Sequence, residues 1–293
     1  FGEVETESLP FPDVTGKAPE KGYLERKLTV AEDKILSCCE KLGVTPNILF
    51  TGVFGILMSR YSNSDDSLFS TIYNGRNDSR LENTVCMLVK TLPVYCKFEA
   101  KTTIQAYMTE LSEQLLSSMA NDIFPFSDIC AKYGFNSDLT FAYQAELSDD
   151  YPIGDTVARG HDLSLDMAKM PLLIQVREYN NEYVLTAEFR SDRYSDAFVA
   201  GMLEAYEAAM DSMLKNKYVS EVSILSENAV KKIAEFNDTA CKYDRTKTIS
   251  DRFTEMVQTI PDHTAVVFKD KKYTYKELDE ISDRLGKYIA SRG

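Results

Sequence analysis

Residues 45–73 read TPNILFTGVFGILMSRYSNSDDSLFSTIY, a helical pattern followed directly by a strand pattern. Thr45 and Pro46 make a good N-cap and first-turn pair, and the apolar residues behind them recur at helical spacing. These features predict a buried helix over 46–61. The apolar run that closes the stretch predicts a strand over 68–73.

The alternation of strands and helices continues on both sides of this stretch. Further strands are expected over 23–30, 86–98, 139–143 and, as a hairpin, 172–176 with 183–189; further helices over 35–42, 104–119 and about 195–215. The polar residues 149–166 fit either a loop or an edge ribbon. Strands that alternate with helices indicate an α/β fold in which a mixed sheet is covered on one face by helices.

A second, smaller α/β pattern follows residue 246. It consists of a helix, two strands and a final helix, expected at 249–257, 265–268, 273–275 and beyond. Thr274 and Glu277 form a capping box for the final helix. The pattern is too short to bury a core of its own, so we expect it to be a truncated piece of a larger domain.

The charge balance excludes two classes of partner. The chain has 33 basic and 46 acidic residues and a net charge of -13, which repels nucleic acid and anionic lipid surfaces. No apolar run approaches the roughly 20 residues that a membrane helix needs, and the first ten residues lack the features of a signal peptide. We therefore expect a cytoplasmic protein without nucleic-acid or membrane partners.

A search for catalytic and metal-binding motifs finds none. The cysteines show no metal-ligand spacing, and the two histidines, His161 and His263, are far apart and share no motif. Gly52 and Gly55 lie in an apolar helical stripe, where small residues permit close helix packing rather than phosphate binding. The residues alone predict no catalytic residue and no metal site in this chain.

Four segments, in their order and spacing, resemble the condensation domains of nonribosomal peptide synthetases. They are the prolines that follow Leu9, the start of a helix at 42–47, the turn 75–77 with the strand motif VCMLVKTLP at 85–93, and NDIFPF at 121–126. The resemblance covers residues 1 to about 226. It implies a chloramphenicol acetyltransferase-like half-sandwich, a mixed sheet with helices.

This sequence departs from the family pattern at several positions. Lys90 stands where the family commonly has asparagine, and Cys86 where it commonly has glycine. The segment around Ser137 lacks the arginine of the family's seventh motif, and the segment 121–126 keeps only the closing half of the sixth. These departures bear on how an acceptor substrate would be handled.

The C-terminal segments 236–239, 262–267 and 273–278 look like the opening of an adenylation domain. The resemblances together imply three parts. These are an inter-lobe connector over 1–22, the C-terminal lobe of a condensation domain over 23–226, and a linker with the truncated start of an adenylation domain over 227–293.

The resemblance implies a function: condensation domains join carrier-bound aminoacyl or peptidyl thioesters by forming an amide bond. Their histidine motif, HHxxxDG, belongs to the other lobe and is absent from this sequence, so we expect the chain to be inactive alone. Lys90, Thr91 and Ser137 would line the tunnel for substrate or pantetheine. Expected partners are the missing N-terminal lobe, peptidyl carrier domains and the rest of the adenylation domain.

The resemblance places no cofactor in this chain itself. The 4'-phosphopantetheine would be carried by partner carrier domains, and ATP and Mg²⁺ would bind only in a complete adenylation domain. Two alternatives to a bond-forming lobe are a noncatalytic docking platform for carrier and adenylation domains and a CoA-dependent acyltransferase of the same fold. The acyltransferase would not need an adenylation opening, and a platform would not need the histidine motif.

Overall fold

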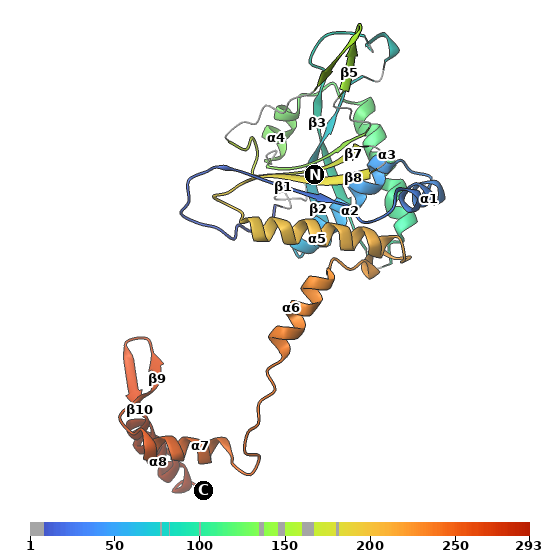
Figure 1. Ribbon diagram of the computed structural model, residues 1–293. Helices are drawn as coiled ribbons and strands as arrows, with labels where there is room; N and C mark the ends of the chain where they lie inside the picture. Colours follow the sequence, from blue (N-terminus) through green and yellow to red (C-terminus); the bar gives the residue numbers. More distant parts are fainter. Residues whose placement is uncertain are drawn as a thin grey trace. The chain divides into compact units, whose positions relative to one another are not determined.

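The computed structural model (Figure 1) describes residues 9–76, 78–81, 83–99, 101–134, 138–145, 150–159, 167–179 and 182–293. By its internal contacts the chain divides into two compact units, one up to residue 233 and the other from 234 to 293.

A six-stranded mixed sheet forms the centre of the first unit. In spatial order its strands are β1 (Lys21–Lys27), β8 (Glu182–Arg190), β7 (Leu172–Tyr179), β4 (Leu139–Gln144), β2 (Asp66–Tyr73) and β3 (Lys90–Lys97). Strand β4 pairs in parallel with both of its neighbours, and the remaining pairs are antiparallel. The expected hairpin is confirmed as β7 and β8.

Helices α2 (Pro46–Tyr61) and α5 (Asp196–Met213) lie along one face of the sheet, as Figure 1 shows. Helices α1 (Glu32–Leu42) and α3 (Ile104–Ala120) pack against α2. Thr45 caps α2 by accepting a hydrogen bond from the amide of Ile48, as its sequence predicts. The arrangement confirms the expected α/β half-sandwich.

The core between α2 and the sheet is built on aromatic side chains. The Phe54 ring lies with its centroid 4.9 Å from the ring centroids of both Phe69 and Phe141. The buried Tyr206 hydroxyl on α5 donates a hydrogen bond of 2.8 Å to the carbonyl of Phe50. Because a fully buried phenylalanine contributes about 1.5–3 kcal/mol, this cluster is a large part of what holds α2 on the sheet.

Gly52 and Gly55 allow α2 to approach its neighbours closely, as the sequence predicts. A Cβ atom at Gly52 would lie 2.5 Å from the methyl carbon of Met108 on α3. One at Gly55 would lie 2.6 Å from the hydroxyl of Tyr107 and 2.7 Å from the sulfur of Cys96. The two glycines are packing residues.

Strand β3 begins later than the sequence predicts, and this part of the expectation 86–98 is wrong. The partner strand β2 ends at Tyr73, which pairs with Lys90, so residues before Lys90 have no strand to pair with. Gly75, at φ +70°, turns the chain away instead. Cys86 therefore lies outside the strand on which the family resemblance placed it, and it is exposed.

Two helices were not predicted. Helix α4 (Phe126–Tyr133) follows Pro125 and ends at Gly134 in the left-handed conformation, and α6 (Glu227–Asn237) crosses the boundary between the units. The polar segment after β4 contains an antiparallel ribbon of β5 (Asp150–Ile153) and β6 (Thr156–Arg159), one of the two expected forms.

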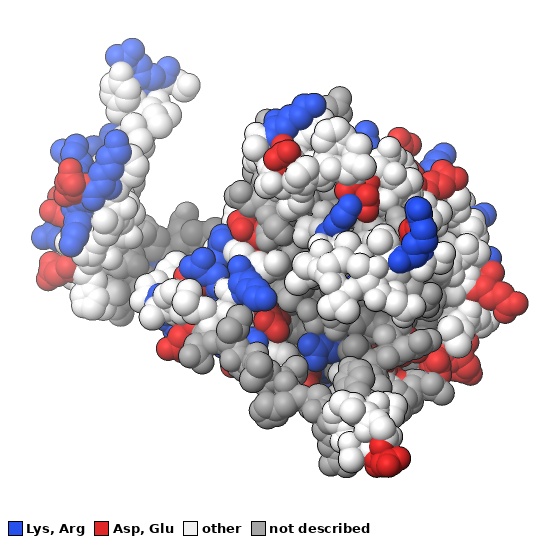
Figure 2. Space-filling model, turned by 90° about the horizontal axis from the view of Figure 1, so that it is seen from above, with Lys and Arg blue, Asp and Glu red and all other residues white. Residues whose placement is uncertain are grey.

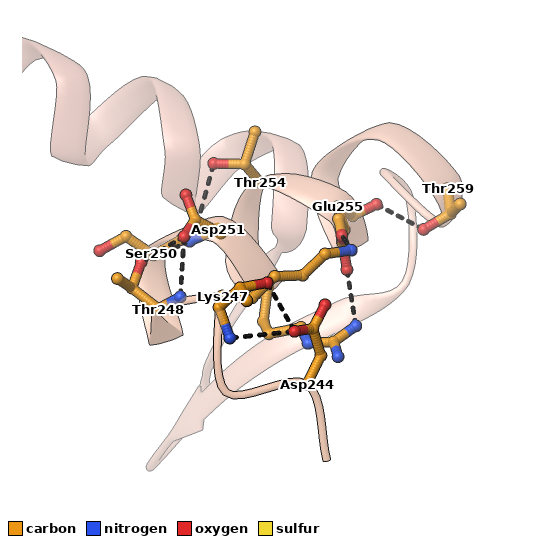
Figure 3. Close-up of polar contacts among 10 residues, drawn as sticks. Asp244, Lys247, Thr248, Ser250, Asp251, Thr254, Glu255 and Thr259 are labelled. Atoms are coloured by element: carbon orange, nitrogen blue, oxygen red, sulfur yellow. Dashed lines mark hydrogen bonds and ion pairs between the residues drawn. The ribbon is translucent and has the colours of Figure 1, made fainter.

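The second unit contains α7 (Ile249–Thr259), β9 (Thr264–Phe268), β10 (Lys271–Thr274) and α8 (Tyr275–Ala290). The expected capping box of Thr274 and Glu277 is present at the start of α8. Figure 3 shows a second capping box at the start of α7, where Thr248 and Asp251 exchange side-chain to backbone hydrogen bonds. Such reciprocal caps satisfy the first free amides of each helix.

On the face shown in Figure 2, acidic and basic side chains are interspersed among uncharged residues. Within the described part of the chain, no single helix is both long enough and apolar enough to cross a membrane. The bent pair α1 and α2 passes such a test only by joint length and composition, and α2 is largely buried in the core.

Candidate functional site

Lys90 and Thr91 lie at the start of β3 and line a small cavity. On the neighbouring strand β2, Tyr73 pairs with Lys90 and Ile72 pairs with Thr91. The cavity has a volume of about 330 Å³, and its walls are the two segments 89–92 and 122–126. The fold thus brings together parts of the two segments, 85–93 and 121–126, that carry the resemblance to the family.

An ion pair joins these two walls. The Lys90 ammonium donates a hydrogen bond of 2.8 Å to the backbone carbonyl of Asp122 and lies 3.0 Å from its carboxylate. The side chains are 39% and 18% exposed, so the pair is partly shielded from water. The contact fixes the start of β3 against the turn that follows α3, and it leaves this wall without net charge.

Tyr73 lies beside the ion pair as the cross-strand neighbour of Lys90. Burial raises the pKa of the Tyr73 phenol, and the negative charge of Asp122 raises it further. The phenol is therefore protonated at neutral pH. It can donate a hydrogen bond near the cavity, but it cannot serve as a base there.

The rim of the cavity is apolar. Val89, Ile123 and Phe124 are 54%, 80% and 67% exposed, large fractions for side chains of this kind. The described residues that line the cavity include no histidine, cysteine or serine. The site therefore offers apolar contact and a few hydrogen-bonding groups, which suit holding a neutral chain rather than attacking it.

Other residues singled out in the sequence do not join this cavity. Ser137 and His161 lie outside the described residues, so the structure does not test their expected roles. His263 belongs to the second unit, where it is exposed. The described residues contain no cluster of three or more potential metal ligands.

Sequence reasoning missed Asp122 as a site residue, although it lies within the segment 121–126 that carried the resemblance. Its separation of 32 residues from Lys90 hides the pairing. One signal was available: a lysine in place of the family's asparagine, on a strand expected to line a tunnel, favours a nearby acid as its partner. Asp122 is the acid in the adjoining motif.

The chain matches one family of proteins over most of its length. Residues 5–234 match the family model described as Condensation domain. Gramicidin S synthase 2 of Brevibacillus brevis is 26% identical over 274 residues, which covers 89% of this chain and 6% of that protein. Bacitracin synthase 1 of Bacillus licheniformis is 25% identical over 281 residues, which covers 92% of this chain and 5% of that protein.

Solved structures share the fold. A holo four-domain nonribosomal peptide synthetase bound to AMP and glycine superposes with a TM-score of 0.65 at 16% identity, covering 99% of this chain and 24% of that one. The first condensation domain of the calcium-dependent antibiotic synthetase, in complex with a substrate analogue, gives a TM-score of 0.60 at 16% identity. That match covers 77% of this chain and 51% of the other.

Proposed function

The chain belongs to the condensation domain family, and from that premise we propose that it supplies one lobe of a nonribosomal peptide synthetase condensation domain. In that role it would help to join carrier-bound aminoacyl or peptidyl thioesters through a new amide bond. The chain spans only 6% and 5% of the two synthetases compared above. The activity of such a whole protein is therefore an inference for this chain.

The cavity between segments 89–92 and 122–126 is the observation that carries the proposal. In amide formation the acceptor amine attacks the thioester carbon, the carbon–nitrogen bond forms, and the carbon–sulfur bond breaks to release the thiol. Holding the two tethered reactants together contributes a large share of the rate in such bimolecular steps. We assign Lys90 and Thr91 to the wall along which the reactants are held.

The cavity fits part of a pantetheine arm by size and charge. Its volume of about 330 Å³ is at the lower end of the roughly 300–1,000 Å³ typical of small-molecule sites. Because Asp122 neutralises Lys90, the wall suits an uncharged chain of amides and methylenes. The 4'-phosphopantetheine itself would arrive on a partner carrier domain, and it supplies the thiol that bears the substrate.

We propose that a complementary lobe completes the site. The sequence holds no HHxxxDG motif, and the solved condensation domain named above is matched over 51% of its length. Both observations fit a division in which the described lobe positions the substrates and another lobe provides the catalytic histidine. We therefore expect no turnover from this chain alone. Ser137 remains a proposed tunnel residue.

The second unit is proposed to be the start of an adenylation domain, preceded by a linker, in the division 1–22, 23–226 and 227–293. The match to a four-domain synthetase over 99% of this chain supports that proposal. ATP and Mg²⁺ would bind in the complete adenylation domain, which with carrier domains would be a partner of the lobe. A cytoplasmic location remains a prediction.

A peptide-forming assay with loaded donor and acceptor carriers tests the proposal. The chain is compared alone and after addition of a separately produced N-terminal lobe that carries the histidine motif. We expect product only in the supplemented reaction. Product from the chain alone would overturn the division of labour proposed above.

A docking platform is the second candidate function. One neighbour of the same fold, the X-domain from teicoplanin biosynthesis, was solved in complex with the protein OxyB, at a TM-score of 0.61 and 14% identity. That neighbour shows that the fold can present a surface to another protein. Carrier binding without product in either arm of the assay would favour this function.

A further inference from the structure

The segment between β2 and β3 is unusually exposed for a part of the chain that leads into the candidate site. The regular structure among its described residues is one 3-10 turn, η1 (Ser79–Leu81). Three apolar side chains at alternate positions, Val85, Met87 and Val89, are 101%, 86% and 54% exposed. A segment that buries so little is expected to open readily unless polar contacts hold it.

Arg76 supplies such contacts from one side chain. Its guanidinium donates hydrogen bonds to three backbone carbonyls of the segment: to Leu81 at 2.5 Å, to Thr84 at 3.0 Å and to Cys86 at 3.3 Å. The planar, permanently charged group can serve several acceptors at once, which an ammonium does less well. The segment is thus held at three points along its length.

The residue before Arg76 closes the same loop. Gly75 adopts φ +70°, a conformation that favours glycine. A Cβ atom at this position would lie 2.1 Å from the carbonyl oxygen of Leu88. Only a glycine therefore lets the chain at position 75 come this close to Leu88. Leu88 stands two residues before Lys90, and the loop therefore ends at the cavity wall.

We propose that Arg76 is a positioning residue for the candidate site. By holding the carbonyls of Leu81, Thr84 and Cys86, it sets the course of the segment that delivers Lys90 and Thr91 to the cavity. The conformational part of this proposal stands on the contacts alone. Its consequence for the reaction rests on the proposed function.

Hydrogen exchange of the whole chain tests the conformational part, with Arg76→Gln as the variant and Arg80→Gln as its matched control. Arg80 lies in the same loop, is 87% exposed and pairs with Asp78 two residues away. Both changes remove one positive charge. We expect exchange over residues 79–92 to rise about tenfold in Arg76→Gln, as for the loss of roughly 1.4 kcal/mol, and to stay at the wild-type rate in Arg80→Gln.

Arg76→Lys gives a second, milder variant, because a single ammonium cannot replace the three-way contact. It keeps the charge, and we expect an intermediate rise in exchange. Equal exchange in Arg76→Gln and Arg80→Gln would overturn the proposal. So would a rise spread evenly over the sheet, which would mark a general loss of stability instead of a local release.

The reaction arm uses the chain supplemented with the N-terminal lobe. We expect Arg76→Gln to lower kcat/KM by about tenfold for the carrier-bound acceptor, with the midpoint of thermal unfolding unchanged, and Arg80→Gln to match the wild type. Unchanged kcat/KM in Arg76→Gln would overturn the link to the site. If the wild-type assembly makes no product, the proposed function fails, and the exchange data still decide whether Arg76 holds the segment.

Discussion

Glu207 on α5 is a buried carboxylate that accepts several hydrogen bonds. It is 7% exposed and accepts hydrogen bonds from the Arg26 Nε at 2.8 Å, the Thr29 amide at 2.7 Å and the Thr29 hydroxyl at 2.5 Å. Burial by itself raises the pKa of Glu207, but the hydrogen bonds from Thr29 and Arg26 outweigh it, and the net pKa is lowered. The carboxylate ties the end of β1 to α5.

This arrangement predicts an acid-sensitive contribution to stability. Since the pKa of Glu207 is lower in the folded chain, the contribution is present above the unfolded pKa of about 4.3 and is lost as pH falls through the folded value. We expect Glu207→Gln to cost about 1–3 kcal/mol at pH 7 and less toward pH 3, measured by urea unfolding across this range.

Glu182→Gln serves as the control for that series. Glu182 is 55% exposed in its pair with Lys27, and such a surface pair is worth at most about 1 kcal/mol. A cost of Glu207→Gln that does not change between pH 7 and pH 3 would show that the lowered pKa does not contribute.

The Lys90–Asp122 pair gives a second prediction for single residues. Asp122→Asn removes the carboxylate but keeps the backbone carbonyl that Lys90 also contacts, so we expect the unfolding free energy to change by less than about 1 kcal/mol. An ammonium without its carboxylate would then face an uncharged arm. We expect kcat/KM in the supplemented condensation assay to fall about tenfold, equivalent to 1.4 kcal/mol.

The double change Lys90→Met with Asp122→Asn provides the check, because it removes the unbalanced charge. Activity closer to wild type in the double variant than in Asp122→Asn would support the neutral-wall account. A fall that is deeper in the double variant would contradict it.

At the scale of elements, the helices and strands whose local sequence pattern agrees with their burial could be predicted from the sequence. Helix α2 was expected at its observed bounds because its cap, its proline and its apolar residues all agree. The β7–β8 hairpin was found for the same reason: its alternating residues face the core. Helix α6 was missed although Val230, Ile233 and Phe236 recur at helical spacing, because the segment around them is mixed and polar; in the structure these three side chains are exposed.

Features that depend on residues far apart in the sequence could not be predicted from local patterns. The start of β3 is set by where β2 ends, since residues before Lys90 have nothing to pair with. Lys90 and Thr91 were identified as site residues by resemblance, but the pairing with Asp122 requires the length and direction of α3 between them. No local sequence pattern indicates that Lys90 and Asp122 come together.

The close approach of helix α2 to its neighbours can be tested at one of its glycines. In Gly55→Ala the new methyl group would meet the Tyr107 hydroxyl at 2.6 Å and the Cys96 sulfur at 2.7 Å. We expect a loss of about 1–3 kcal/mol from overpacking, measured by chemical denaturation, despite alanine's better helix propensity.

Gly201→Ala is the matched control. Gly201 lies within α5, and nothing stands within 4 Å of a Cβ atom built there. The higher helix propensity of alanine should then by itself stabilise the chain by about 0.5–1 kcal/mol. If both variants shift stability in the same direction, the close approach of α2 to its neighbours is not as described.

At the scale of the whole molecule, the two units differ in how they bury apolar residues. The buried cluster that forms the core consists of residues between Leu28 and Val222, all in the first unit. In the second unit, side chains such as Phe268, Leu285 and Ile289 are 65%, 57% and 60% exposed. The first unit therefore buries an apolar core of its own, and the second unit does not.

Removal of residues 238–293 should therefore leave the first unit intact. We expect its thermal unfolding midpoint to stay within about 2–4 °C of the full chain, since 1 kcal/mol corresponds to a shift of this size at this length. Circular dichroism of both chains checks this. A larger fall in the midpoint would show that the second unit contributes to the stability of the first.

We expect the cavity at the start of β3 to line the path of the substrate-bearing arm. Photo-crosslinking tests it most directly, with a carrier domain whose pantetheine arm ends in a photoreactive group, added to the chain assembled with its N-terminal lobe. We expect crosslinks within residues 89–92 and 122–126, and we expect Asp122→Asn to weaken them. Crosslinks that form efficiently elsewhere on the chain and spare both segments would contradict it.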